Sequence, residues 1–379
     1  MIQMVCLGKK NDTPLAKTLD KTTTPFSCCC CCCCCCCCCC CCSSSLFVAN
    51  AFLRPFSFSS HARTHGTPRS GVMSSVNATE AFLDETLRVA KRCAFLAGKE
   101  ISNAWGTSSS LVKNSKKNDV DLVTATDEKC EKMIKECISE AFPEHSIVGE
   151  EETARAGDVI PQMSAQPTWY VDPVDGTTNF IHSYPNSCVS IGLCVNEEPV
   201  VGVVFNPISR EMFVGVKGRG SQLIKVGGRN LDEEMEVQSI QVSTTDALKK
   251  ALIATEIGVG RDEKTINAIM GRIRNIVQKS RSVRCTGSCA MNMCAVASGR
   301  VDGYFEIGFG GPWDNCAATV IVRESGGVVV DPSGEEMHLN ARRVLCANSR
   351  EIVEEFVAAL KPVEDGPAEP PKPSLATTL

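Results

Sequence analysis

The chain has few of the features that mark nucleic-acid-binding or membrane proteins. Its formal net charge is only -5 over 379 residues, and aromatic residues make up 5% of it. No stretch reaches the roughly 20 consecutive apolar residues that a membrane-spanning helix requires. The composition therefore gives no indication of a nucleic-acid partner or of a membrane span.

Cysteine is abundant, but its spacing is not that of a disulfide framework or a zinc module. Most of the 26 cysteines form one unbroken run from Cys28 to Cys42, and the others are scattered singly without Cys-x-x-Cys spacing. The scattered cysteines have apolar neighbours, where a free thiol behaves as a small buried hydrophobe. We therefore expect a reducing compartment. In such a compartment the formal glycosylation triplet Asn77–Thr79 has no role.

Acidic residues are absent from Ser27 to Thr79, where arginines and many serines are present. This bias is typical of organelle transit peptides rather than of a folded core. Met73 would also serve as an independent start. Residues 1–72 are thus either a disordered extension that targets a plastid or mitochondrion, or sequence upstream of the start of a cytoplasmic protein. The cysteine run is most simply a translated repeat, with S-acylation or metal binding as the alternative.

The remaining chain divides into a long body and a short tail. Residues 73–361 are enough for one large domain or two tightly fused halves. Residues 362–379 are rich in proline and acidic residues, which predicts a disordered tail.

Helical and strand periodicities both recur in the body. Helical spacing covers Thr79–Ala104, Glu128–Phe142, Ile266–Val277, Ser288–Ser298 and Asp314–Glu324. Strand patterns cover Ser146–Gly149, Thr168–Val171, Cys188–Val195, Val200–Phe205, Glu211–Val216, Ala251–Glu256, Val301–Glu306 and Val328–Asp331. Glycines between the strands, such as Gly218 and Gly220, predict hairpin turns rather than a phosphate loop. The pattern predicts an α/β or α+β protein with sheets layered between helices.

Two carboxylates lie three residues apart at the end of an apolar strand, in Asp172-Pro-Val-Asp175-Gly-Thr-Thr. Aspartate oxygens suit hard cations such as Mg2+, and the backbone N–H groups of a helix start suit an anion. A simpler explanation is a tight turn with Asp175 as the N-cap of a helix. Capping alone would not require Asp172. The motif therefore predicts a site that holds cations against a phosphate.

Carboxylates recur at the ends of predicted strands and the starts of predicted helices. These are Asp127, Glu150, Glu151, Glu306 and Asp314. Each one alone is more simply a solvated surface acid, and Asp314 is also explained as an N-cap. Together with the Asp172 motif they favour a shared metal site, to which the Val174 carbonyl could add an oxygen ligand.

Several of these motifs occur in an order that resembles the inositol monophosphatase family. The matching segments are Asp121–Asp127, Gly149–Glu151, Asp172–Phe180, Gly287–Asn292, Tyr304–Glu306 and Trp313–Asp314, and the resemblance covers Ala81–Lys361. It implies an alternating α-β-α-β-α layered fold, usually a homodimer, that uses Mg2+ and is inhibited by Li+. The implied reaction is hydrolysis of a phosphate monoester, above all myo-inositol 1-phosphate, in inositol synthesis and phosphatidylinositol signalling.

The resemblance also assigns roles to individual residues. Two to three Mg2+ ions would be held by Glu150, Asp172, Val174, Asp175 and Asp314, with Asp172 between two of them and Glu151 behind the ligands. Asp127, Thr177 and Glu150 would orient and activate the attacking water. The substrate would contact Gly176, Thr177, Ser288, Cys289, Glu306 and Asp314, with Glu306 accepting hydrogen bonds from the polyol. No histidine or cysteine nucleophile is required, and His182 and His338 are more simply structural or exposed.

Two departures from the family pattern concern the substrate pocket. Glu306–Asp314 is one residue longer than in animal members, and Cys316 replaces a small Ala or Gly. The Gly310-Gly-Pro312 sequence resembles plant members, which also accept L-galactose 1-phosphate. Histidinol phosphate, a 3'-phosphonucleotide and fructose 1,6-bisphosphate are alternative substrates. A different class of function is a non-catalytic regulator, since bacterial members also bind the transcription machinery.

Overall fold

The computed structural model describes residues 79–107, 112–115, 122–227 and 236–372. The interpretations of residues 1–72, including the targeting extension and the cysteine run, lie outside these residues. None of the described helices combines the length and apolar character needed to cross a bilayer.

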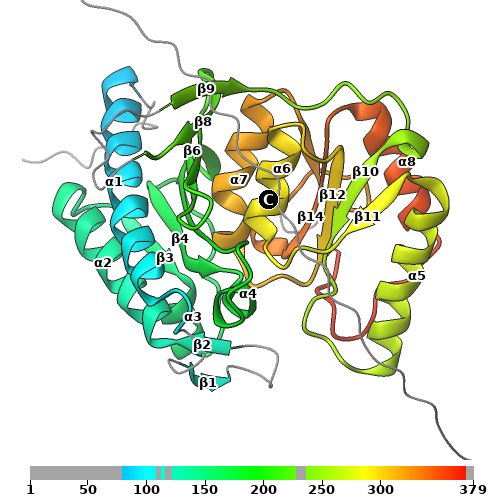
Figure 1. Ribbon diagram of the computed structural model, residues 1–379, viewed down its shortest axis with the longest axis horizontal. Coiled ribbons are helices and arrows are strands. Elements are labelled where there is room, and N and C mark those ends of the chain that lie inside the picture. Colours follow the sequence, from blue (N-terminus) through cyan, green and yellow to red (C-terminus); the bar gives the residue numbers. More distant parts are fainter. Residues whose placement is uncertain (1–78, 108–111, 116–121, 228–235, 373–379) are drawn as a thin grey trace, which may run out of the picture. The chain divides into compact units, whose positions relative to one another are not determined.

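The first layer consists of two long helices, α1 (Glu80–Ala104) and α2 (Ala125–Ala141), which pack against one face of a large sheet (Figure 1). Apolar residues recur at helical spacing along α1 and are buried, and the Thr79 side chain accepts a hydrogen bond from Phe82 N at its start. A short antiparallel pair, β1 (Val112–Ser115) and β2 (Leu122–Thr124), precedes α2. The two helices predicted in this region are confirmed.

The second layer is a seven-stranded sheet in sequence order from β3 to β9, with only β3 and β4 parallel. Every residue of β4, β5 and β7 is buried because helices cover both faces, which explains their continuous apolar sequences. The predicted hairpin turn joins β7 to β8, where Gly218 and Gly220 have φ of +77° and +79°. The strands are β3 Ser146–Gly149, β4 Thr168–Asp175, β5 Cys188–Val195, β6 Glu198–Asn206, β7 Glu211–Val216, β8 Gly220–Lys225 and β9 Glu236–Ile240.

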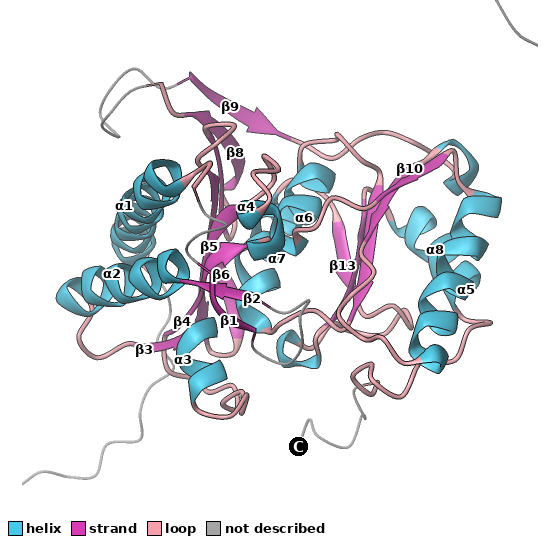
Figure 2. Cartoon of the chain, turned by 60° about the horizontal axis from the view of Figure 1, so that its bottom comes forward, coloured by secondary structure: helices cyan, strands magenta, loops and turns pink. Residues whose placement is uncertain are grey.

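The third layer is the helix pair α6 (Cys289–Ala297) and α7 (Pro312–Glu324), which lies between two sheets (Figure 2). Residues 312–322 of α7 are all buried, as expected for a helix covered on every side. The α7 backbone approaches the large sheet so closely that a Cβ atom at Gly202 would overlap the Ala317 carbonyl. Glycine in β6 therefore allows this helix to pack flat on the sheet.

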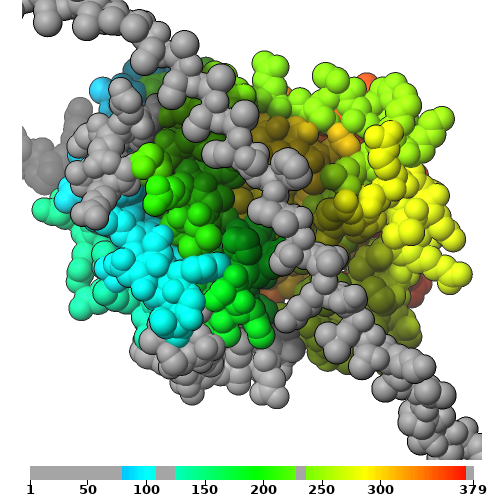
Figure 3. Space-filling model, viewed as in Figure 1, coloured from blue at the N-terminus to red at the C-terminus, as the bar shows by residue number. Residues whose placement is uncertain are grey.

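The fourth layer is a five-stranded sheet in the order β11-β10-β12-β14-β13, and α5 and α8 cover it as the fifth layer. The predicted α-β-α-β-α arrangement is thus confirmed. Figure 3 shows the blue-cyan, green and yellow parts of the sequence following one another from left to right across one face. All described residues belong to one compact unit. The elements are β10 Leu252–Thr255, α5 Glu263–Lys279, β11 Ser282–Arg284, β12 Gly303–Ile307, β13 Val328–Val330, β14 Arg343–Ala347 and α8 Arg350–Leu360.

The prediction of a disordered tail is wrong for residues 362–372, which pack against α5 and β14. Asp365 and Glu369, two acids of the tail that was predicted to be disordered, form ion pairs with the buried side chains of Arg272 and Arg343. Opposite charges that lie far apart in the sequence give this segment a folded structure. Residues 373–379 lie outside the described part of the chain.

Candidate active site

Asp172 and Asp175 belong to one site because β4 is irregular between them. In a regular strand, side chains three positions apart point to opposite faces of the sheet. The register of β4 against β5 shifts between the two residues, and such irregularities redirect side chains. Asp172 Oδ1 also accepts a hydrogen bond from Val174 N at 2.9 Å, and both carboxylates are buried.

The third carboxylate, Asp314, comes from the first turn of α7. One carboxylate oxygen from each of Asp172, Asp175 and Asp314 lies within 4.8 Å of the others, and all three side chains are buried. The helix begins at Pro312 with Gly311 as its N-cap, so the explanation of Asp314 as a simple N-cap is excluded. Instead, Asp314 Oδ2 accepts from Gly311 N at 2.6 Å. Three converging carboxylates form a donor set that fits a hard divalent cation.

The Asp175 carboxylate binds the start of α6, although the helix that directly follows Asp175 in the sequence is α4 (Thr177–Ile181). Its Oδ2 accepts hydrogen bonds from Ser288 Oγ and Ala290 N, both at 2.7 Å, at the start of α6. The N-cap of the short helix α4 is Gly176. The interpretation of Asp175 as that N-cap is therefore excluded. Gly176 has φ of +90°, and a Cβ there would lie 2.9 Å from the Asn186 carbonyl oxygen, so both its conformation and its surroundings require glycine.

Burial and mutual repulsion raise the pKa values of the three carboxyl groups. Burial is the largest cause in each case. The pKa of Asp175 rises to about 6. Burial, followed by the charges of neighbouring acids that include Glu150, raises the pKa values of Asp172 and Asp314 well above their ordinary range. A bound cation would relieve this repulsion and displace the protons.

Glu150 lines the same cavity from the first position of α3 (Glu150–Arg155), and its charge is among those that raise the pKa of Asp172. It lies outside the group of three acids whose oxygens converge within 4.8 Å. Val174 also lines this cavity, and its carbonyl oxygen accepts from Thr177 Oγ1 at 3.1 Å. Glu151 is buried behind Glu150.

Glu131, which the sequence analysis missed, holds the start of α3 in place. This buried acid of α2 accepts hydrogen bonds from Glu151 N at 2.7 Å and from Glu152 N at 3.0 Å. Gly149 leaves room for it, because a Cβ there would overlap the Glu131 carboxylate. The position of Glu150 therefore depends on a residue nineteen places earlier in the numbering, beyond the reach of local sequence patterns.

Asp127 and Thr177 form a hydrogen-bonded pair beside the carboxylate group. Thr177 Oγ1 lies 3.1 Å from Asp127 Oδ1 and 3.1 Å from the Val174 carbonyl oxygen, and its single proton serves these two acceptors. Asp127 is buried in the first turn of α2, where it accepts from Thr124 N at 3.2 Å. The lone pairs of the Thr177 oxygen stay available to a water molecule.

Together with Glu150, Asp172 and Asp175, the residues that the sequence analysis assigned to substrate border one cavity of about 730 Å3. The residues assigned to substrate are Gly176, Thr177, Ser288, Cys289, Glu306 and Asp314. The pKa of Glu306 is raised to about 8, mainly by burial and secondly by the charge of Glu256. Tyr304 donates a hydrogen bond to Glu306. Burial also raises the pKa of the Cys289 thiol, which is therefore a poor nucleophile.

Glu256 was also missed by the sequence analysis, although it shapes the cavity wall. Its Oε1 accepts hydrogen bonds from Thr286 N, Gly287 N and Asn292 Nδ2 at 2.7–2.8 Å. This carboxylate fixes the loop that leads to Ser288. Its position at the end of the predicted strand Ala251–Glu256 was the one available signal.

Comparisons with known proteins agree with this geometry. The profile of the "Inositol monophosphatase family" matches residues 83–364. The chain belongs to this family. It is 45% identical over 285 residues to "Inositol monophosphatase 2" of Solanum lycopersicum, a match that covers 75% of this chain and 100% of that protein. It is 37% identical over 247 residues to "Inositol monophosphatase 1" of Homo sapiens, covering 65% and 84% of the two chains.

The fold of this family member is also similar to that of solved inositol monophosphatase structures. The inositol monophosphatase from Anabaena (Nostoc) sp. PCC 7120 aligns with a TM-score of 0.61 and 31% identity, covering 75% of this chain and 98% of that one. The family match and its named relatives identify the chain as a phosphoric monoester hydrolase.

Cys316, which departs from the family pattern, lies in α7, the helix that also carries Asp314. Cys316 is fully buried in α7, and its sulfur lies 3.6 Å from that of Cys194 in β5. A Cβ at Gly192 would lie 2.5 Å from the Cys316 sulfur, so glycine in β5 provides the space for the larger residue. The carboxylate group is retained despite this substitution.

We expect Mg2+ to stabilise this protein more at pH 7.5 than at pH 5. Folding raises the pKa of Asp175 from 3.8 to about 6, so the protonated side chain favours the folded state. This contribution to stability is complete below pH 3.8 and is lost as the pH rises through about 6. The metal-free protein therefore carries unrelieved repulsion at pH 7.5, which a bound cation removes. Thermal unfolding with Mg2+ or with matched ionic strength would measure this. An equal Mg2+-induced change in Tm at both pH values would contradict it.

Proposed function

We propose that this enzyme hydrolyses myo-inositol 1-phosphate and related polyol or sugar monophosphates with the help of Mg2+. The observation that carries the proposal is that the carboxylate group and Glu306 border the same cavity. One part of that cavity would take the phosphate, and Glu306 would accept hydrogen bonds from hydroxyl groups of the alcohol. The names of plant and human relatives support the same substrate class.

Two to three Mg2+ ions would be held by Glu150, Asp172, Asp175, Asp314 and the Val174 carbonyl. When bound, Mg2+ neutralises charge on the phosphate and acidifies water. Li+ is proposed as an inhibitor, in line with the family's character.

Residues of the chain would position the reactants. Thr177 Oγ1 donates to Asp127, so a water that donates to Thr177 would be oriented, and its proton would pass through the Thr177 hydroxyl to the Asp127 carboxylate. The backbone N–H groups of Gly176 and Thr177 would bind phosphate oxygens. Ser288 and Cys289 would contact the substrate from the start of α6.

The Gly310-Gly-Pro312 sequence in the lengthened loop between Glu306 and Asp314 resembles plant members and supports a second candidate substrate, L-galactose 1-phosphate. Gly308, Phe309 and Gly310 of this loop border the cavity directly, so its length alters the wall that faces the alcohol. A panel of myo-inositol 1-phosphate, L-galactose 1-phosphate, histidinol phosphate, fructose 1,6-bisphosphate and a 3'-phosphonucleotide would separate the candidates. The proposal fails if the folded enzyme prefers a substrate without a polyol or sugar.

Changing Glu306 to Gln is expected to lower kcat/KM for myo-inositol 1-phosphate by roughly 10- to 100-fold, because leaving a buried hydroxyl group of the substrate without its acceptor costs about 1–3 kcal/mol. Hydrolysis of p-nitrophenyl phosphate, which has no polyol hydroxyls, should change less than about threefold. Steady-state kinetics on both substrates would measure the difference. An unchanged rate with inositol phosphate would remove the basis for polyol recognition through Glu306.

We further propose a homodimer, which the family resemblance implies; sedimentation would determine the oligomeric state. The compartment depends on residues 1–72, which lie outside the described residues. A mature N-terminus at Met73 would indicate the cytoplasm, and a longer processed form would favour a plastid or mitochondrion. Mass spectrometry of the natural protein would distinguish them.

A further inference from the structure

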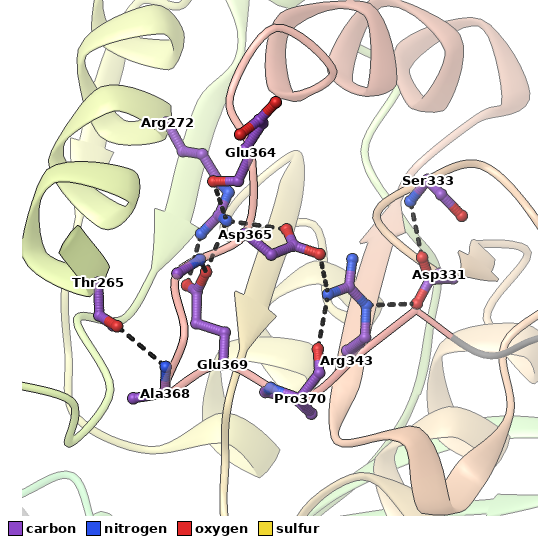
Figure 4. Close-up of polar contacts among 11 residues, drawn as sticks. Thr265, Arg272, Asp331, Ser333, Arg343, Glu364, Asp365, Ala368, Glu369 and Pro370 are labelled. Atoms are coloured by element: carbon purple, nitrogen blue, oxygen red, sulfur yellow. Dashed lines mark hydrogen bonds and ion pairs between the residues drawn. The ribbon is translucent and has the colours of Figure 1, made fainter.

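The segment 362–372, hereafter the C-terminal strap, is bound by two arginines buried outside the active site (Figure 4). The side chains of Arg272 in α5 and Arg343 in β14 are 3% and 1% exposed. Glu369 forms a two-pronged pair with Arg272, at 2.6 and 2.7 Å. Asp365 lies 2.9 Å from both arginines and thereby joins α5 to β14. A buried charge without a partner is costly, so these pairs hold the strap in one position.

Most of the strap lies beyond the part of the chain that resembles the family. The family profile ends at residue 364, whereas the two acids that pair with the arginines are Asp365 and Glu369. The strap also orders its own backbone, because Gly366 N donates to Glu369 Oε2 at 2.6 Å. It is therefore a built feature of this chain that the family match does not account for.

Pro370, near one end of the strap, lies next to Gly308 of the substrate-side loop 307–311. A Cβ at Gly308 would lie 3.6 Å from Pro370 Cδ, and the Pro370 carbonyl accepts from Arg343 Nη1 at 3.1 Å. The neighbouring Arg342 holds the same loop, since its carbonyl accepts from Gly308 N at 2.9 Å and its Nε donates to the Phe309 carbonyl at 2.7 Å. Gly308, Phe309 and Arg342 all border the active-site cavity.

The middle of the strap packs on Thr265 in the first turn of α5, the helix that directly follows loop 256–261. Ala368 N donates to Thr265 Oγ1 at 3.2 Å, and a Cβ at Gly366 would collide with Thr265, so the strap lies directly on this residue. A Cβ at Gly260 would lie 2.7 Å from Thr265 Cγ2 and 3.4 Å from Ala368 Cβ. Residues 256–259 and Arg261 of this loop border the active-site cavity.

We propose that the C-terminal strap positions loops 256–261 and 307–311 and thereby sets the affinity of the enzyme for the alcohol part of its substrate. The effect on substrate affinity rests on the proposed function, because it is measured with the proposed substrate. The effect on hydrogen exchange in the two loops does not. None of the described strap residues borders the active-site cavity, so the chemical step depends on the strap little. Its residues are positioning residues that act through the two loops.

The test uses the full chain with Ala368→Gly and Pro370→Gly together, which removes the strap atoms nearest to Gly260 and Gly308, Ala368 Cβ and Pro370 Cδ, and leaves the ion pairs intact. Hydrogen exchange should quicken in peptides from loops 256–261 and 307–311, but not in α1 or α2. The KM for myo-inositol 1-phosphate should rise roughly 3- to 30-fold with kcat changed less than about twofold. KM for p-nitrophenyl phosphate should remain unchanged.

Glu364→Gln is the matched control, because the contact recorded for Glu364 in the strap is made by its backbone carbonyl. It should behave as the natural protein does. Unchanged exchange in both loops, or faster exchange throughout the protein, would overturn the proposal. If the natural enzyme fails to act on any polyol phosphate, the proposed substrate is wrong, but loop exchange still decides whether the strap positions the loops.

The isosteric pair Asp365→Asn and Glu369→Gln provides a second test if the glycine variant is poorly folded. Removing the two charges should release the strap and quicken exchange in the same two loops. Loops that remain as protected as in the natural protein, after the strap itself has become exchangeable, would also overturn the proposal.

Discussion

Replacing Asp172 with Asn is expected to lower the rate of phosphate release more than about 100-fold, while the metal-free protein becomes no less stable. Even residues that only orient metal ligands cost about 10- to 100-fold when changed, and Asp172 is at the centre of the proposed ligand set. The substitution also removes one of several buried like charges, so Tm without metal should stay the same or rise. Phosphate release and thermal unfolding of the metal-free protein would measure both effects.

The control is Asp246→Asn, the same chemical change at an exposed acid that pairs only with Lys250 among its recorded contacts. It should keep full activity. A loss of activity with Asp172→Asn that is accompanied by a large fall in the metal-free Tm would indicate a structural role instead. Undiminished activity would contradict the placement of Asp172 in the metal site.

Replacing Thr177 with Val should lower kcat by roughly 10²- to 10⁴-fold, the usual contribution of a positioned proton acceptor. The change removes the hydroxyl that donates to Asp127 but keeps the branched shape of the side chain. Mg2+ affinity should change little, because no carboxylate is altered. Steady-state kinetics and calorimetric titration with Mg2+ would separate these two quantities.

Thr177→Ser is the matched variant, since it keeps the hydroxyl and loses only a methyl group. We expect it to retain activity within about tenfold of the natural enzyme. If Thr177→Val were as active as Thr177→Ser, the pair of Asp127 and Thr177 would have no part in orienting water.

The segments that bring Asp172, Asp175 and Asp314 together could be predicted because each is a local pattern. An apolar strand followed by Asp172 and Asp175, and an apolar helix beginning near Asp314, are visible in short windows of sequence. Periodicity likewise predicted most of the layers. The role of Asp175 at α6 could not be predicted, because Ser288 and Ala290 come to it only through tertiary packing.

The same limit explains the residues and elements that the sequence analysis missed. Glu131 and Glu256 act on backbone groups far along the chain, which no local spacing reveals. No element was assigned to β14 or α8, although both are present. The tail was judged by composition alone, whereas its order depends on Arg272 and Arg343, which lie 97 and 22 residues from the acids they bind.

The most direct test of the account is the initial rate of phosphate release from myo-inositol 1-phosphate by the full chain, measured as Mg2+ is titrated after chelation. The account predicts no release in the chelated enzyme and a rate that rises with Mg2+ to saturation. Release that persists unchanged in the chelator, or a folded enzyme that releases no phosphate at any Mg2+ concentration, would contradict it.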